Sequence, residues 1–130
     1  MILRQGIDII ENKRIERIYL QYKNIFLNKI LTTNEINELK KINSKITIIK
    51  KITSRFSAKE AVAKALGTGF REGLKFTDIE IIYDNLGKPN LKINKEILDK
   101  FFDKKNKVSS SVSISNEKTH TIALVTFILI

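Results

Sequence analysis

The sequence has no cysteine and no tryptophan, and only one proline, one histidine and five glycines among its 130 residues. The lack of cysteine excludes a disulfide framework, a thiolate metal site and a cysteine nucleophile, and it fits a reducing compartment. One histidine does not support a Ser-His-Asp arrangement, so we interpret His120 as structural. Neither a phosphate-binding P-loop nor a dinucleotide-binding glycine motif is present.

Long hydrophobic runs are also absent. The longest run, Ile122 to Ile130, is interrupted by Thr126 and falls far below the roughly 20 residues that span a bilayer. Arg4 and Asp8 interrupt the start of the chain, where a signal peptide would be apolar. We therefore expect a soluble, cytoplasmic protein with no membrane partner. The length and the apolar fraction of 42% predict one domain over residues 1–130.

Acidic residues are scarce, with 14 against 24 basic residues, so that the net charge is +10 and the pI is 9.8. Such a balance indicates an anionic partner, which is a nucleic acid, a phosphorylated ligand, an acidic protein or a membrane surface. Most of the cations are lysine, in a composition also rich in isoleucine and asparagine that AT-rich coding would produce. The few arginines are therefore the more informative cations.

Hydrophobic periodicity and turn signals predict nine elements in the order β-α-α-α-β-β-α-β-β. These are a strand at 3–10, a helix capped by Asn12, a short helix opened by the capping box Thr32-x-x-Glu35, a long helix at 46–66, a hairpin of strands at 79–84 and 88–93, a helix at 95–103, and strands at 112–115 and 120–129. The last strand is apolar on both faces, which predicts a central position. The pattern predicts an α+β domain with a largely antiparallel sheet packed with one long and several short helices.

One carboxylate on the long helix breaks the pattern. Glu60 lies at the centre of a stripe otherwise formed by Ile49, Ile52, Phe56, Ala63 and Gly67. A carboxylate there costs several kcal/mol unless it is paired or binds a metal.

Two interpretations of Glu60 remain open. It forms an ion pair with Lys64, four residues further along the helix, or it binds a hard cation together with a second carboxylate. Asp8 is the best second ligand, because it lies in an apolar strand two residues after flexible Gly6. The alternative for Asp8 is a solvent-facing strand position.

Basic residues and glycines provide weaker signals. Seven basic side chains and no acid occupy residues 40–59, namely Lys40, Lys41, Lys45, Lys50, Lys51, Arg55 and Lys59. Arg14 and Arg17 fall on the solvent face of the first helix. The turn Gly67-Thr68-Gly69 either ends the long helix or brings backbone amides to a phosphate, and we favour the helix end. Lys64 is placed to meet a phosphate oxygen as a point charge.

Four segments together resemble a known family. They are Gly6-Ile-Asp8-Ile-Ile-Glu11, Arg55-Phe-Ser-Ala-Lys59-Glu60-Ala61 with Lys64-Ala-Leu-Gly67-Thr68-Gly69, Gly87-Lys88-Pro89, and Ser113-Ile-Ser115. Their order and spacing are similar to the holo-(acyl-carrier-protein) synthases, the small bacterial branch of the 4′-phosphopantetheinyl transferase superfamily. The resemblance covers essentially the whole chain, and the block around Glu60 is its most specific part.

The resemblance implies an enzyme that transfers 4′-phosphopantetheine from coenzyme A to a serine of apo acyl carrier protein and releases adenosine 3′,5′-bisphosphate. It implies Mg²⁺ held by Asp8 and Glu60, a homotrimer, and coenzyme A sites between two subunits. Glu60 would also help to deprotonate the serine, directly or through a metal-bound water, and Lys64 would stabilise the transferring phosphate.

The resemblance also implies the residues that contact coenzyme A and the carrier protein. Residues matching the coenzyme A site are Arg55, Lys64, Gly67, Thr68, Gly69, Ser113, Ser115 and Asn116. Arg14 and Arg17 match the surface for the acidic carrier protein, with an ordinary solvated helix face as the alternative. Many relatives have histidine where this chain has Asn116, so a histidine base at that site is excluded here.

Two other functions compete with transfer. The charge alone favours a basic nucleic-acid-binding module, but Tyr19, Tyr22, Phe26 and Phe56 fall on apolar registers rather than on a stacking platform. We therefore expect no nucleic acid partner. The other alternative is an inactive relative that only binds coenzyme A or the carrier protein, for which Asn116 is the sole support.

Overall fold

The computed structural model describes all 130 residues and contains five strands, five α-helices and one 3₁₀ helix. In chain order these are β1 (Ile2–Glu11), α1 (Asn12–Tyr22), α2 (Asn24–Ile30), α3 (Thr33–Lys40), α4 (Lys45–Leu66), η1 (Phe76–Asp78), β2 (Ile79–Tyr83), β3 (Pro89–Ile93), α5 (Lys95–Phe101), β4 (Val108–Asn116) and β5 (His120–Leu129). The predicted α+β class is confirmed.

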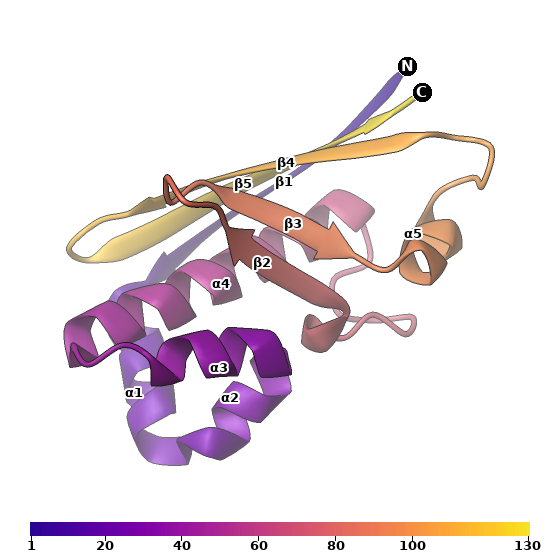
Figure 1. Cartoon of the computed structure of the whole chain (residues 1–130). Coiled ribbons are helices and arrows are strands. Elements are labelled where there is room, and N and C mark those ends of the chain that lie inside the picture. The colour runs from indigo at the N-terminus through magenta and orange to yellow at the C-terminus, as the bar shows by residue number, and fades with distance from the viewer.

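Two antiparallel sheets form the β part of the fold. The larger sheet has the order β1-β5-β4, and β2 and β3 form a separate hairpin. The last strand is therefore central, as its apolar residues predicted. The two sheet neighbours of β5 place Asp8 opposite Ala123 and Asn116 opposite Thr121. Figure 1 shows α4 running beneath the sheet, with α1, α2 and α3 on the far side of α4.

The long helix α4 is enclosed on several sides, which the single apolar stripe did not predict. Ala58, Ala61, Val62, Ala63 and Ala65 are all buried in its second half. Their small side chains let the sheet approach closely, and β1 and β5 both contact α4 extensively. The helix ends at Gly67, which adopts a left-handed conformation with φ of 88°.

Gly6 marks the closest approach between β1 and α4. A Cβ atom added at Gly6 would lie 1.9 Å from the carbonyl oxygen of Ala61 and 2.6 Å from the amide nitrogen of Ala65. Gly6 is therefore required for contact with the helix backbone, and not for flexibility as its sequence context suggested. The contact directs the same face of β1, including Asp8, towards α4.

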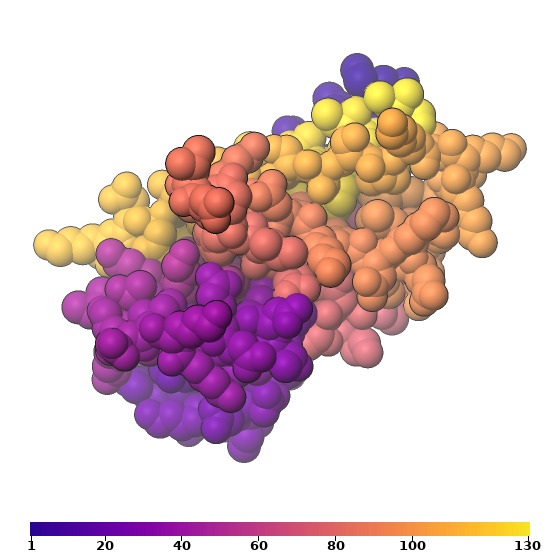
Figure 2. All heavy atoms as spheres, in the orientation of Figure 1, coloured from indigo at the N-terminus to yellow at the C-terminus, as the bar shows by residue number.

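Two apolar clusters hold the elements together. One joins α4 to β5, to the hairpin and to α5, and includes Val62, Ile79, Val125 and Phe127. The other joins α1, α2 and α3 to the first half of α4. In Figure 2 the first three helices form one end of the molecule, and the hairpin and α5 cover another part of α4 and the sheet.

Three local predictions differ from the structure. Residue Glu11, and not Asn12, occupies the N-cap of α1 and makes no side-chain capping bond. A separate helix, α2, follows α1 because Lys23, between the two, adopts a positive φ of 50° that interrupts the helix. The predicted helix at 95–103 ends earlier, at Phe101.

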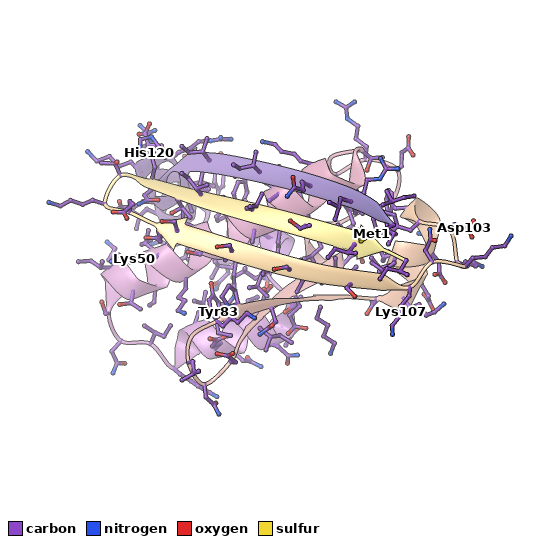
Figure 3. All side chains as sticks on the ribbon, turned by 90° about the horizontal axis from the view of Figure 1, so that it is seen from above. Met1, Lys50, Tyr83, Asp103, Lys107 and His120 are labelled. Carbon is purple, nitrogen blue, oxygen red and sulfur yellow. The ribbon has the colours of Figure 1, made fainter.

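The outer face of the larger sheet is uncovered, and it is apolar over much of β1 and β5. Figure 3 shows this face from above, with no helix or hairpin over the three strands. Side chains on it have large exposed fractions, among them Leu3 at 57%, Ile7 at 60% and Ile9 at 62%, together with Ile122 and Leu124 from the central strand. A contiguous apolar face of this kind is typical of a contact surface.

A buried ionic cluster connects four elements. Glu35 completes the predicted capping box of α3 by accepting from the Thr32 amide, and its carboxylate also contacts Lys59 Nζ at 2.6 Å and Arg55 Nε at 3.4 Å. It further accepts from the amide of Ile81 in β2 at 2.9 Å. Lys59 also donates to the carbonyl of Ile30 at the end of α2. Arg55 and Lys59, two of the seven basic residues at 40–59, are therefore internal.

Replacing Glu35 by glutamine tests this cluster. Glu35, Arg55 and Lys59 are each at most 1% exposed, and burial lowers the pKa of Lys59 even though Glu35 acts to raise it. Removing the carboxylate leaves Lys59 without an anionic partner and Arg55 with Glu38 alone, so we expect Glu35→Gln to lower the free energy of unfolding by about 3–5 kcal/mol. Urea unfolding followed by circular dichroism measures this loss.

The exposed ion pair between Lys95 and Asp99 on α5 provides the control. Asp99→Asn should cost no more than about 1 kcal/mol, because surface pairs contribute little. Equal losses for Glu35→Gln and Asp99→Asn would contradict a central role for the buried cluster.

Candidate functional site

Asp8 and Glu60 converge between β1 and α4. Ser57 Oγ donates to Asp8 Oδ2 at 3.0 Å, and Lys64 Nζ lies 3.3 Å from Asp8 Oδ1. Ser57 and Lys64 lie one helical turn before and one turn after Glu60 on the same face of α4. The carboxylate of Asp8 therefore contacts both neighbours of Glu60, and the two acidic side chains share one site.

The structure contains neither the ion pair between Glu60 and Lys64 nor the solvent-facing Asp8 that remained as alternatives from the sequence. Lys64 pairs with Asp8 and donates to the Ile7 carbonyl at 3.0 Å, so no ion pair joins it to Glu60. The side chain of Asp8 is only 12% exposed and faces the helix rather than solvent. The single cation at the site, Lys64, is itself 54% exposed.

The site disfavours the charged form of the Glu60 carboxylate. Burial raises the pKa of Glu60, the nearby charge of Asp8 raises it further, and Lys64 and Arg14 only partly offset these effects. Two close carboxylates in a half-buried place repel each other, and a divalent cation relieves such repulsion.

The donor set fits Mg²⁺. Carboxylate oxygens are hard ligands, and Mg²⁺ typically uses one or two of them and completes its octahedron with water and phosphate oxygens. No group of three or more potential His, Cys, Asp or Glu ligands exists in the chain. A two-carboxylate Mg²⁺ site needs no further acidic residue.

A pocket of about 220 Å³ lies on the other edge of the sheet. Its walls come from α4, the hairpin and the end of β4, and consist of Lys50, Lys51, Ser54, Tyr83, Gly87, Pro89, Ile114 and Asn116. The predicted Gly87-Lys88-Pro89 turn and Asn116 are thus brought together. Burial, reinforced by the charge of Arg55, lowers the pKa of Lys51, whose ammonium lies 3.8 Å from the Tyr83 ring centre.

Arg55 lies behind this pocket rather than in it. The side chain is 0% exposed and its guanidinium is paired with Glu35 and Glu38. It lies 5.2 Å from the centre of the Tyr83 ring, a cation–π contact that fixes one wall of the pocket. In this position Arg55 reaches no solvent-accessible surface, and its direct contact with coenzyme A stays a prediction.

Ser113 and Ser115 also do not line the pocket of their own chain. Side chains alternate along β4, so that Val112, Ile114 and Asn116 point inward while the two serines are exposed on the opposite face. Any contact of these serines with a ligand would have to be with one that lies over the outer face of the sheet.

The Gly67-Thr68-Gly69 turn acts as a helix end. The Gly67 amide bonds to the carbonyls of Ala63 and Lys64, and the Gly69 amide bonds to Ala63. These amides are therefore not free for a phosphate, in agreement with the favoured interpretation. At a rise of 1.5 Å per residue, the turn also lies about 20 Å along α4 from Ser54, which lines the pocket beside β4.

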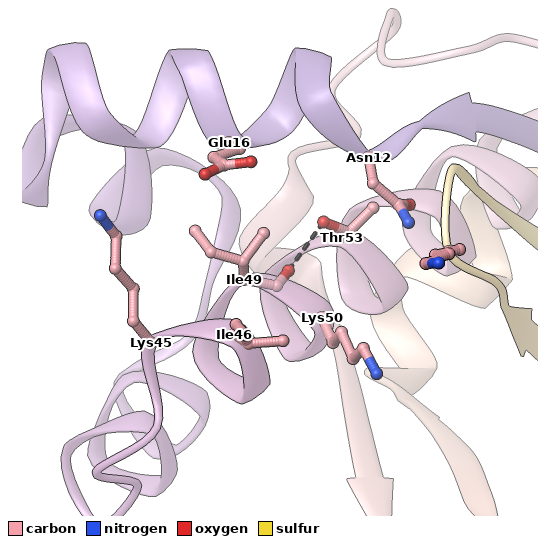
Figure 4. A pocket seen from close by; sticks show the side chains of 8 residues that line it. Asn12, Glu16, Lys45, Ile46, Ile49, Lys50 and Thr53 are labelled. Carbon is pink, nitrogen blue, oxygen red and sulfur yellow. Dashed lines mark hydrogen bonds between the residues drawn. The ribbon is translucent and has the colours of Figure 1, made fainter.

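A second basic pocket, also of about 220 Å³, lies between the start of α1 and the start of α4 (Figure 4). Lys45, Lys50 and Lys118 line it together with Glu16. The figure shows Thr53, whose hydroxyl donates within its own helix to Ile49, at the base of this pocket. Lys50 borders both basic pockets.

Arg14 and Arg17 are exposed on α1, as predicted. Beside the same helix lies an apolar pocket of about 420 Å³, with Ile18, Tyr22, Phe26 and further apolar side chains in its wall. Tyr22 is 50% exposed, so the first helix turns less of its predicted apolar face inward than its spacing suggested. Cations and an apolar recess therefore adjoin on one surface.

Sequence reasoning missed several residues of the site. Ser57 orients Asp8, Ser54 and Tyr83 form walls of the pocket, and Glu35 neutralises Arg55. Only Ser57 had a signal in the sequence, since it lies three residues before Glu60 and thus on the same helical face. Tyr83 and Glu35 reach their partners through tertiary packing.

Comparison with known proteins agrees with this geometry. The profile of the 4′-phosphopantetheinyl transferase superfamily matches residues 4–125. The chain is 44% identical over 128 residues to a holo-[acyl-carrier-protein] synthase of Pelagibacter ubique, covering 95% of this chain and 94% of that protein. It is 45% identical over 127 residues to a holo-[acyl-carrier-protein] synthase of Buchnera aphidicola, covering 97% of each.

Solved structures give the same result. The fold is similar to that of the Helicobacter pylori holo-[acyl-carrier-protein] synthase in complex with coenzyme A, with a TM-score of 0.79 and 33% identity over 97% of this chain and 99% of the other. The chain belongs to the 4′-phosphopantetheinyl transferase superfamily. Within that superfamily, its curated relatives at 40–45% identity are the holo-[acyl-carrier-protein] synthases.

The raised pKa of Glu60 predicts a stability effect that is independent of activity. The folded chain binds the carboxyl proton of Glu60 more tightly than the unfolded chain does. Protonation of Glu60 therefore contributes its full stability below the pKa of the unfolded state, and this contribution is lost as the pH rises through the pKa of the folded state. In the presence of a chelator, we expect Glu60→Gln to have a higher Tm than the parent at pH 7.5 and no advantage at pH 4. Thermal unfolding at the two pH values measures the difference.

Glu96→Gln, at an exposed position on α5, removes an equal charge and controls for net charge. A parent that matches Glu60→Gln at pH 7.5, or a gain of equal size from Glu96→Gln, would show that Glu60 carries no strain as an anion.

Proposed function

We propose that this chain is a phosphopantetheinyl transferase that moves 4′-phosphopantetheine from coenzyme A to a serine of apo acyl carrier protein in the cytoplasm. The observation that carries the proposal is the convergence of Asp8 and Glu60, from β1 and α4, beside Lys64. The names of its relatives and the coenzyme A complex of one of them support the same reaction.

Asp8 and Glu60 would hold Mg²⁺, which supplies charge neutralisation for the diphosphate of coenzyme A. Ser57 keeps Asp8 in place through its 3.0 Å hydrogen bond. Lys64, half-exposed beside Asp8, adds a positive charge where a phosphate oxygen approaches.

In the reaction, the serine hydroxyl loses its proton and its oxygen forms a bond to the phosphorus that carries the pantetheine arm. The bond from that phosphorus to the bridging oxygen breaks, and adenosine 3′,5′-bisphosphate leaves with the electron pair. The raised pKa of Glu60 brings it closer to the range in which a carboxylate accepts a proton at neutral pH.

Copies of this chain would complete each site as a homotrimer. Within one chain, β5 separates the carboxylates on the β1 side from the pocket beside β4, about 10 Å away at the spacing of neighbouring strands. The uncovered apolar face between these edges gives the copies a surface on which to meet. Ser113 and Ser115, on that face, would then adjoin a site shared between subunits.

The carrier protein would dock on α1. Arg14 and Arg17 supply positive charge for an acidic partner, and the apolar pocket beside them accepts a hydrophobic side chain. Arg14 also lowers the pKa of Glu60 by its charge, so the docking surface adjoins the carboxylates.

Transfer to apo carrier protein tests the reaction. Incubation with coenzyme A and Mg²⁺ should add one phosphopantetheine arm to the carrier, measured by mass spectrometry. We expect Asp8→Asn and Glu60→Gln to lower the rate at least about 100-fold, because each removes a ligand of the charge-neutralising cation. Glu96→Gln should keep the parental rate.

Mg²⁺ should also raise the Tm of the parent and leave the Tm of both variants unchanged, which reports on binding without turnover. Near-parental transfer by either variant at saturating Mg²⁺ would overturn the metal assignment. No transfer by the parent itself would reject the reaction.

Charge reversal on α1 tests the docking surface. Arg17→Glu should raise the KM for carrier protein about tenfold and leave the Kd for coenzyme A unchanged, because the like charges of the glutamate and the acidic partner repel and slow their encounter. Lys104→Glu, exposed between α5 and β4, makes the same change in net charge and should alter neither value. If the two variants had equal effects, Arg17 would act only through the net charge of the protein and not as a docking residue.

A further inference from the structure

Ser57 contacts Asp8 at two atoms from a completely buried position on α4. Its Oγ lies 3.0 Å from Oδ2 of Asp8 and 3.3 Å from the backbone carbonyl oxygen of the same residue. A carboxylate oxygen and a carbonyl oxygen both accept, so the single hydroxyl proton of Ser57 is shared between them. The shared hydrogen bond joins the carboxylate of Asp8 to its own backbone and fixes the direction in which the carboxylate points.

The two carboxylate oxygens of Asp8 therefore differ in their surroundings. Oδ2 is held by the buried hydroxyl of Ser57. Oδ1 lies 3.3 Å from Nζ of Lys64, whose side chain is 54% exposed. A lysine side chain is a point charge on a long, flexible stem. Oδ1 is thus the oxygen that can exchange one cation for another, whereas Oδ2 is kept in place by the helix.

Mg²⁺ and Ca²⁺ differ in how they use a carboxylate. Mg²⁺ requires a near-ideal octahedron with ligands at about 2.0–2.1 Å, and the two oxygens of one carboxylate lie too close together to fill two corners of it. Ca²⁺ takes about six to eight ligands at about 2.3–2.6 Å and accepts a carboxylate through one oxygen or through both. A carboxylate that offers a single oxygen therefore suits Mg²⁺ and removes one mode of binding from Ca²⁺.

We propose that Ser57 is a positioning residue that restricts Asp8 to binding a metal ion through Oδ1, and that this restriction selects Mg²⁺ over Ca²⁺ at the site shared with Glu60. The inference rests on the proposed function, which assigns Asp8 and Glu60 as the ligands, and adds the group that determines which ion they prefer. Ser57 lies about one turn before Glu60 on the same face of α4. The helix that supplies one ligand thus also orients the other.

Removal of the Ser57 hydroxyl has different consequences for the two ions. Oδ2 of Asp8 loses its donor, so the carboxylate is free to turn about its last side-chain bond. Mg²⁺ then meets a ligand that is no longer held in place, and hydrogen bonds that orient metal ligands contribute about 10–100-fold to metal affinity. Ca²⁺ loses the same orientation but gains access to both oxygens, so the two effects oppose each other for Ca²⁺ alone.

Thermal unfolding of chelator-treated protein with added MgCl₂ or CaCl₂, at constant ionic strength, tests the assignment. The dependence of Tm on ion concentration gives a Kd for each ion without turnover. We expect Ser57→Ala to raise the Kd for Mg²⁺ about tenfold and to leave the Kd for Ca²⁺ within about twofold of the parent. The ratio of the two values is the diagnostic quantity, because a general loosening of the fold would weaken the binding of both ions alike.

Three further variants provide the controls. Ser57→Thr keeps the hydroxyl and should return the ratio of the two Kd values to within about twofold of the parent. Thr53→Val should change neither value, because Thr53 is equally buried one turn earlier on α4 but its hydroxyl donates to the Ile49 carbonyl and not to Asp8. Asp8→Asn should abolish the Tm shift with either ion, which locates both ions at this site. Circular dichroism confirms that each variant is folded before an ion is added.

Three results would overturn the inference. The first is a loss of affinity by the same factor for both ions in Ser57→Ala, the second is no change in either Kd, and the third is an equal shift of the ratio in Thr53→Val. A parent whose Tm responds to neither ion would instead reject the metal assignment within the proposed function, so the two failures are distinguishable.

Discussion

The close contact between β1 and α4 at Gly6 is the constraint on which the site depends. No side chain larger than hydrogen fits between the strand and the helix backbone, since a Cβ atom would lie 1.9 Å from the Ala61 carbonyl oxygen. Two residues later on the same face of the strand, Asp8 meets Ser57 and Lys64. A wider separation would leave the Asp8 carboxylate short of the helical turn that carries Glu60. The geometry of the site that holds Asp8 and Glu60 is therefore set by backbone packing before any charge is considered.

The charge of the protein divides into two kinds once the structure is known. Arg55 and Lys59 are internal and are paired with Glu35 and Glu38, so their charges are compensated within the fold. Most other cations remain at the surface, including the lysines around the two basic pockets and the arginines of α1. This arrangement accounts for a high net charge in a protein whose relatives are named for an acyl carrier protein rather than a nucleic acid.

The sequence predicted the α+β class, the central last strand and the proximity of Asp8 to Glu60. Each of these leaves a local signal, either in the hydrophobic periodicity or as a carboxylate at an apolar position. It did not predict the burial of Arg55, since that depends on Glu35, twenty residues earlier and on another helix. The serines of β4 were assigned by resemblance, although alternation along the strand already placed Ser113 and Ser115 opposite to Val112. Local sequence patterns were enough to locate the helices and strands and the anomalous Glu60. Contacts between residues that only tertiary packing brings together could be identified only from the structure.

Glu35 takes part both in the local capping of a helix and in the tertiary packing of that helix against its neighbours. The same carboxylate closes the first turn of α3, meets two cations from α4 and accepts the amide of Ile81 in β2. The start of α3 cannot fray without releasing a strand of the hairpin and exposing two charges. Amide hydrogens of α3 and β2 should therefore exchange with solvent in a common opening event, so that the small helical end and the hairpin behave as one cooperative unit.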